Sequence, residues 1–127
     1  MYKTMNKAME RPTTYAFIDS QNLNLGVCSQ GWQLDFEKFY ICLKDKFRIK
    51  KANVDVELTI DVIKESSLYD NMILISGDSD FAHLIEVLQK EGKKVIVFSA
   101  RGHVSKELIK LSDYYVNFEK LKNEIAI

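Results

Sequence analysis

The chain has 127 residues, enough for one domain with a single core. Hydrophobic residues make up 46% of it, so a packed globule is expected and disorder is excluded. Lys and Arg together number 18, as do Asp and Glu, so no overall basic charge points to nucleic acid.

The N-terminal residues 1–13 are expected to form an extension that precedes a single domain at residues 14–127. They are polar and lack the apolar segment of a secretory signal. No apolar stretch anywhere approaches the ~20 residues that span a bilayer. We therefore expect a cytoplasmic protein that does not contact a membrane.

Two strands and two helices are expected in the first half of the domain. An apolar run at residues 14–19 predicts a buried strand. Asp35 is a suitable N-cap for an amphipathic helix that carries Phe39 and Leu43. A short basic strand is predicted at residues 48–52. The next helix is predicted at residues 54–67, with one apolar face made of Val56, Ile60 and Ile63.

The second half repeats a strand-then-helix pattern. Strands are predicted at residues 72–76, 94–99 and 114–118, and helices at residues 80–91 and 105–111. Gly92 is the expected stop of the first of these helices. Strands that alternate with helices predict an α/β fold with a parallel sheet and right-handed crossovers.

Acidic residues follow two of the apolar strands. Asp19 comes directly after the first strand, and Asp78 and Asp80 follow the strand at residues 72–76. In open α/β sheets, ligands bind outside the carboxyl ends of the strands, so these acids are expected at one sheet edge. Carboxylates that lie close together repel one another, and a divalent cation is the usual way to hold them charged. The pattern predicts metal-dependent chemistry on phosphates.

Each acid also has a purely structural explanation. Asp19 could form an Asx-type turn, and Asp80 could cap the helix that follows it. Capping alone does not easily explain why two neighbouring strands both end in acids. Asn22 could orient a carboxylate or a metal-bound water. The serines nearby could bind carboxylate or phosphate oxygens, although a role in turns is favoured; they are Ser20, Ser76 and Ser79.

Other familiar sites do not match the sequence. Asp19 is not followed two residues later by a second Asp, as a haloacid-dehalogenase-type phosphatase requires. The chain has neither a P-loop nor a G-x-G-x-x-G loop after the first strand. His83 and His103 are not spaced as a metal-binding pair. The basic run at residues 44–51 favours a solvated surface over a nucleic-acid patch.

Three segments together resemble the NYN domain family. They are Phe17-Ile18-Asp19-x-x-Asn22, Val54-Asp55-Val56 and the stretch SGDSDF at residues 76–81. The similarity extends from about Tyr15 to Leu121 and is strongest to the LabA/DUF88-type branch of the PIN-like nuclease superfamily. It implies a PIN-like Rossmannoid fold of three layers, in which a mainly parallel central sheet is flanked by helices.

The same resemblance implies a Mg²⁺- or Mn²⁺-dependent endoribonuclease that hydrolyses RNA phosphodiester bonds. Carried over by position, the acidic cluster and catalytic set would contain Asp19, Asp55, Asp78 and Asp80, with Asn22 as a polar companion. Asp61 matches an acidic position of some relatives and is a less firm ligand. Ser76 and Ser79 would support the cluster. The metal would be held by carboxylates and waters.

The chain departs from the family around residues 48–54. Relatives place a fuller strand, a helix and another strand before the segment at Val54, and such a unit needs roughly 30 residues. Here Ala52 and Asn53 join what the pattern predicts to be the start of a strand to the start of a helix. Either the domain is shortened, or a segment between these two residues is missing from the sequence, which is the favoured alternative.

Three functions are compatible with these features. The leading one is a ribonuclease acting on single-stranded or structured RNA. The second is a non-catalytic LabA-like regulatory or RNA/protein-binding module that keeps the metal site. The third is another phosphoesterase, such as a DNA nuclease. Tyr69 or Trp32 could stack bases, although core packing is favoured for both. A homo-oligomer is a further expectation, because open sheet edges leave backbone groups unpaired.

Overall fold

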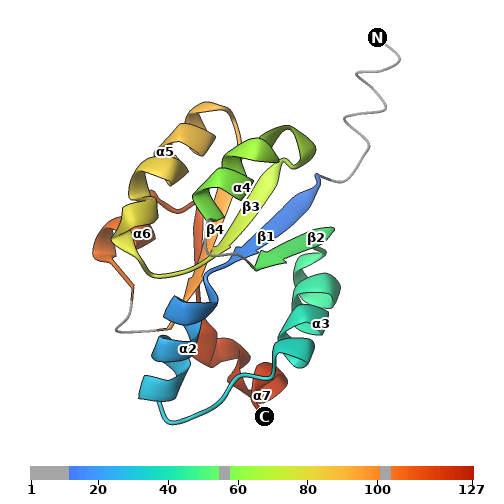
Figure 1. The fold of residues 1–127 in the computed structure, drawn as a ribbon, viewed down its shortest axis with the longest axis vertical. Coiled ribbons are helices and arrows are strands. Elements are labelled where there is room, and N and C mark those ends of the chain that lie inside the picture. The colour runs from blue at the N-terminus through green and yellow to red at the C-terminus, as the bar shows by residue number, and fades with distance from the viewer. Residues whose placement is uncertain (1–11, 55–57, 101–103) are drawn as a thin grey trace.

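A five-stranded parallel sheet forms the centre of the protein, with strand order β2-β1-β3-β4-β5 (Figure 1). It is seen in a computed structural model that describes residues 12–54, 58–100 and 104–127. The strands are β1 (Thr14–Ile18), β2 (Lys51–Val54), β3 (Asn71–Ile75), β4 (Lys94–Ser99) and β5 (Tyr114–Asn117). The predicted α/β class with a parallel sheet is confirmed.

Helices cover both faces of this sheet, which makes three layers (Figure 1). One face packs against α2 (Ser20–Ser29), α3 (Phe36–Phe47) and α7 (Lys122–Ile125). The other packs against α4 (Leu58–Lys64), α5 (Ala82–Lys90) and α6 (Lys106–Leu111). Short 3-10 turns are η1 (Ser66–Leu68), η2 (Ser79–Phe81) and η3 (Phe118–Leu121). Of the helices described, none is long and apolar enough to cross a membrane.

The apolar run of β1 is explained by burial on both faces. Ala16 and Ile18 belong to the core beneath α2 and α3, whereas Tyr15 and Phe17 belong to the core beneath α4 and α5. All five residues of β1 are buried. Side chains of a strand alternate between faces, so a strand covered on both sides is mainly apolar, and only Thr14 at the start of β1 is polar.

The strand order reverses at β1. The chain leaves β1 through α2 and α3 on one face to reach β2, and then returns through α4 on the other face to β3, on the far side of β1. Later connections continue outward from β3 through α5 and α6. Right-handed crossovers in opposite directions place helices on opposite faces. The carboxyl ends of β1 and β3 therefore flank a topological switch point, where open α/β sheets bind ligands.

Helix α3 begins where the sequence predicted, but α2 was not predicted. The Asp35 side chain accepts a hydrogen bond of 3.1 Å from the Lys38 backbone N–H, which is the expected N-cap. In α2, only Leu23, Gly26 and Val27 are buried. This narrow apolar stripe contains a glycine, and such a composition gives little periodic signal.

The segment around β2 differs from its prediction. The strand predicted at residues 48–52 lies at Lys51–Val54, and it passes through Ala52 and Asn53 without a break, each paired in register with β1. Val54 therefore ends a strand, and the argument for a missing segment, which needed a helix start there, loses its premise. The described α4 begins at Leu58 instead.

The predicted apolar face of this helix is also wrong. Ile60 and Ile63 are 56% and 55% exposed, whereas Leu58 and Val62 are buried against the sheet. Val56 lies outside the described residues. The buried face was predicted wrongly because this short helix has apolar residues on both faces. The spacing of apolar residues alone then does not show which face packs against the sheet.

The second half agrees closely with the prediction, apart from one capping residue. Strands β3, β4 and β5, the Gly92 stop and helix α6 are all found within one or two residues of their predicted bounds. The residue that caps the turn after β3 is Asp78 rather than Asp80, because its side chain accepts a hydrogen bond from the Asp80 N–H. The 3-10 turn η2 then leads into α5 at Ala82.

One acidic side chain ties the short edge strand β2 to the α4 side of the sheet. Glu65 accepts hydrogen bonds from the Lys51 Nζ at 2.8 Å and from the Asn53 Nδ2 at 2.7 Å. Hydrogen bonding from Lys51 is the main cause of a lowered pKa of Glu65. These two contacts hold β2, which lies at one edge of the sheet.

The end of the chain is bound to the loop before α3. The Asp35 N–H donates to the carbonyl of Ile125 at 2.8 Å, and the Ile127 N–H donates to the carbonyl of Gln33 at 3.0 Å. Leu34 and Ala126 form an antiparallel bridge. Helix α7 thereby completes the α2–α3 layer, a feature that the sequence did not predict.

The Glu65 contacts predict a pH dependence of stability. Because the pKa of Glu65 is lower in the folded protein, the stability it contributes is present above its unfolded pKa of about 4.3 and is lost as the pH falls through the folded value. A Glu65→Gln variant should therefore be less stable than the wild type at pH 7, with a difference that shrinks below pH 4. Urea unfolding across this range measures it.

The matched control is Glu86→Gln, an exposed acid on α5. It should change the unfolding free energy little at either pH. A Glu65→Gln deficit that is the same at pH 7 and at pH 3.5 would contradict the assignment.

Candidate functional site

The candidate site lies where β1 and β3 end side by side. Ile18 pairs with Ile75, and the Asp19 N–H donates to the Ile75 carbonyl at 3.0 Å. The next residues, Asp19 and Ser76, are therefore neighbours, although 57 positions separate them in the sequence. Parallel pairing in this register brings the two acidic segments to one edge, as the sequence predicted.

A network of hydrogen bonds connects Asp19 and the start of α2 to the loop after β3. The Ser76 hydroxyl donates to Asp19 Oδ2 at 3.0 Å and accepts from the Asp78 N–H at 3.2 Å. The other carboxylate oxygen of Asp19 accepts from the Asn22 N–H at 3.2 Å, which makes Asp19 the N-cap of α2. The Asn22 Oδ1 in turn accepts from the Gly77 N–H at 2.9 Å. Each chain segment thus holds the other in place.

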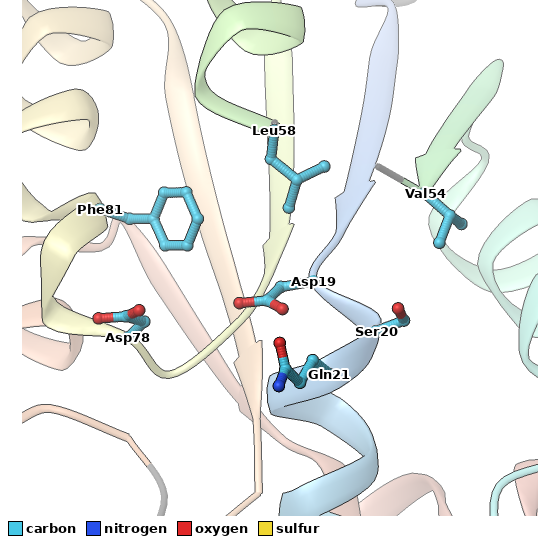
Figure 2. Close-up of a pocket in the computed structure, with 7 residues that line it drawn as sticks. All are labelled: Asp19, Ser20, Gln21, Val54, Leu58, Asp78 and Phe81. Carbon is cyan, nitrogen blue, oxygen red and sulfur yellow. The ribbon is translucent and has the colours of Figure 1, made fainter. Parts of the chain in front are cut away.

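Asp19 and Asp78 face a common pocket of about 320 Å³. Figure 2 shows the Asp19 carboxylate near the centre, with Asp78 and Phe81 on one side and Ser20 and Val54 on the other. The lining residues are Asp19, Ser20, Gln21, Val54, Leu58, Asp78 and Phe81. The pocket opens at the switch point of the sheet, where a ligand is expected.

Both acids of the pocket are partly exposed and are held by neutral groups. Among the described residues, neither Asp19 nor Asp78 forms an ion pair with Lys or Arg. The positive end of the α2 dipole stabilises the negative charge of Asp19. Negatively charged carboxylate oxygens that no described Lys or Arg neutralises are suitable ligands for a hard cation.

Of the remaining predicted acids, the two that the structure describes, Asp61 and Asp80, do not line this pocket. Asp80 is exposed and contributes its backbone N–H to Asp78 at 2.9 Å, and Ser79 beside it is also exposed. Asp61 lines a separate hollow together with Lys51 and Glu65. Asp55 lies outside the described residues. Within the described ranges, no three Asp, Glu, His or Cys side chains gather as a metal-binding set.

Several lining residues were not predicted as part of the site. Gln21 points to the pocket because it lies in the first turn of α2, a helix that the sequence did not predict (Figure 2). Phe81 and Leu58 fall within the helices predicted at residues 80–91 and 54–67, and neither was predicted to be a site residue. Phe81 could have been predicted as a site residue, because it follows Asp78 by three residues in the turn after the strand predicted at residues 72–76.

Both aromatic residues considered for base stacking are buried, and two lysines of the basic run form ion pairs. Tyr69 and Trp32 are 2% and 7% exposed, so the favoured interpretation of core packing is confirmed. Burial raises the pKa of Tyr69 well above its ordinary value. Within the basic run, Lys46 pairs with Glu124 and Lys51 with Glu65. His83 is exposed on α5.

A family model for the NYN domain matches residues 41–119, more than half of the chain. The chain belongs to the NYN domain family. The matched region contains Asp78 and Asp80 and begins after Asp19 and Asn22. Because β1 pairs with β3, Asp19, which precedes the matched region, lies beside residues of that region in one site.

Two known proteins are similar to this chain, one in sequence and one in fold. It is 33% identical over 76 residues, or 60% of its length, to the low amplitude and bright protein LabA of Synechococcus elongatus. This match spans 41% of LabA, about two-fifths of that protein's length. A crystal structure of a Vibrio parahaemolyticus protein of unknown function superposes with a TM-score of 0.73 at 20% identity, covering 94% of this chain and 98% of the other. The second match shows the shared fold.

The role of Asn22 in joining the two segments can be tested by removing its side chain. An Asn22→Ala substitution leaves the buried Gly77 N–H without its acceptor, which should cost about 1–2 kcal/mol of unfolding free energy. Hydrogen exchange of the Gly77 amide should accelerate at the same time. Asn24→Ala, an exposed position on the same helix, is the control and should change neither quantity. Equal losses in both variants would contradict the assignment.

Proposed function

We propose that this protein is a divalent-metal-dependent ribonuclease that hydrolyses RNA phosphodiester bonds at the pocket between β1 and β3. The observation that carries the proposal is the position of Asp19 and Asp78 at the ends of two adjacent strands, where both face one pocket and neither forms an ion pair with a described Lys or Arg. Membership of the NYN domain family, whose PIN-like members are typically nucleases, supports the same class of chemistry.

The donor set of the pocket fits Mg²⁺ or Mn²⁺. In enzymes that act on phosphates, Mg²⁺ is commonly bound by one or two carboxylates, with waters and substrate phosphates as the remaining ligands. Asp19 and Asp78 supply two such carboxylates in the described part of the chain. When bound, the cation would offset the charge of the phosphodiester and favour ionisation of an attacking water. Asp55 and Asp80 are proposed as further members of the acidic set, and Asp61 less firmly.

The neighbouring side chains would hold the acids in place during the reaction. Ser76 donates to one oxygen of Asp19 and accepts from the Asp78 backbone, so it sets the relative position of the two acids. Asn22 is a positioning residue, because its side-chain oxygen is engaged by Gly77. A preorganised arrangement of this kind lowers the reorganisation needed when charge develops on the phosphate.

A second candidate function is a non-catalytic binding module that keeps the cation site. The observation that favours it is that, in the described part of the chain, only two acids line the pocket and no third Asp, Glu, His or Cys joins them. Such a module would bind the cation and RNA, or a protein partner, without turnover. The two candidates differ in whether RNA is cleaved.

Cleavage of a labelled mixed-sequence RNA with Mn²⁺ or Mg²⁺ tests the leading proposal. The wild type should cleave with either cation and lose activity in EDTA. An Asp78→Asn substitution should lower the rate on the order of a hundredfold or more, because loss of even an indirect metal contact typically costs 10- to 100-fold. Gel electrophoresis of the RNA over time measures the rates.

The control is Asp45→Asn, an exposed acid on α3, which should retain the wild-type rate. Cleavage that persists undiminished in Asp78→Asn would refute the site. A folded wild-type protein that binds Mn²⁺ in a titration but leaves every RNA intact would select the second candidate.

A further inference from the structure

The pocket between β1 and β3 has two chemically different sides. Asp19, Ser20, Gln21 and Asp78 form a polar side, and the opposite side, here called the apolar wall, consists of Val54, Leu58 and Phe81. Figure 2 shows the Phe81 ring and Leu58 above the two acids. A site that held only a cation and a phosphate would have no use for this wall.

Phe81 is held firmly while part of its ring remains accessible. Its backbone N–H donates to the Asp78 carbonyl at 3.2 Å, which fixes it in the turn η2. The ring packs against the core of the α4–α5 layer but is only partly buried. By comparison, Leu84, Ile85 and Leu88, which pack into the same core from α5, are at most 6% exposed. The pocket therefore has a partly accessible aromatic surface beside its acids.

This arrangement suits a ligand with a phosphate next to a flat apolar group. A nucleotide has both, and aromatic side chains stack on the faces of bases without regard to sequence. The pocket volume of about 320 Å³ is at the small end for ligand sites. The bases of a duplex are covered by their neighbours on both faces, so a base can reach the wall only when it is unpaired and unstacked.

We propose that Phe81 stacks on one unpaired base adjacent to the phosphate that Asp19 and Asp78 receive through a cation, with Leu58 and Val54 completing the wall. The substrate class is then single-stranded RNA or an unpaired loop. This inference rests on the proposed function, since it assumes that the acids receive a phosphodiester. It adds the residue that determines which RNA can enter.

The other aromatic residues considered for base stacking cannot take this role. Tyr69 and Trp32 are buried in the two cores. Tyr114 is 72% exposed, but it begins β5 and so lies at the opposite edge of the sheet from the acids. This position makes Tyr114 a suitable control.

Binding to two eight-residue chains tests the inference. One is a fluorescein-labelled single-stranded RNA of mixed sequence, and the other is a labelled ribose-phosphate chain of equal length without bases. Fluorescence anisotropy is measured with Ca²⁺ as the cation, and a gel verifies that the chains stay intact. The wild type should bind the base-bearing chain about tenfold more tightly than the baseless chain, as expected for one stacked base.

Phe81→Leu keeps an apolar side chain and removes the aromatic face. It should lose most of the preference for the base-bearing chain while binding the baseless chain as the wild type does. Phe81→Trp should restore the preference, and Tyr114→Leu should not change it. Because the measured quantity is a ratio of two affinities on one protein, a general loss of folded protein cancels, and thermal melting verifies the fold of each variant.

The outcomes separate this inference from the proposed function. If Phe81→Leu keeps the wild-type preference, or if the wild type has none, Phe81 does not stack a base, and the cleavage experiment still decides whether the protein is a nuclease. If the wild type binds neither chain, both the inference and RNA as the substrate are refuted.

Discussion

The in-register pairing of β1 with β3 is the constraint on which the rest of the structure depends. Each strand is apolar on both faces, so each needs cover from two helical layers and a strand on either side. Because Ile18 pairs with Ile75, this register also fixes the positions of the residues that follow the two strands. Asp19 and Ser76 become partners, and Asn22 reaches the Gly77 backbone. A shift of one residue would exchange the two cores and separate these groups.

The site combines a stiff frame with acids that lack cationic neighbours among the described residues. The hydrogen bonds to the two carboxylates come from neutral groups, and no Lys or Arg in the described ranges pairs with Asp19 or Asp78. Their negative charge is tolerated because both side chains are partly open to solvent and one of them caps a helix. The same features allow a cation and a phosphate to enter together.

The sequence predicted the parts of the molecule that are governed by local signals. Apolar runs located four of the five strands to within one or two residues, and Asp35 marked the start of α3. Helix α2 was missed because its buried stripe is narrow, and the face of α4 was misassigned because apolar residues lie on both of its sides. The sequence also predicted that Asp19 and Asp78 lie at one edge of the sheet, because each follows a parallel strand and such strands end at the same edge. The apolar wall could not be predicted, since it depends on how Leu58 and Phe81 meet across elements far apart in sequence.

The attachment of the C-terminal segment to the loop before α3 has a consequence for how the protein folds. The hydrogen bonds of Ile125 and Ile127 join residues about 90 positions away, at Asp35 and Gln33. Contacts between such distant positions form late, because a long loop must be closed first. During synthesis, the part of α3 that packs against α7 therefore stays exposed until residues 122–127 have left the ribosome. In the nascent chain, the α4–α5 layer can assemble earlier, which makes the unfinished α2–α3 layer the part most open to chaperones or to misassociation.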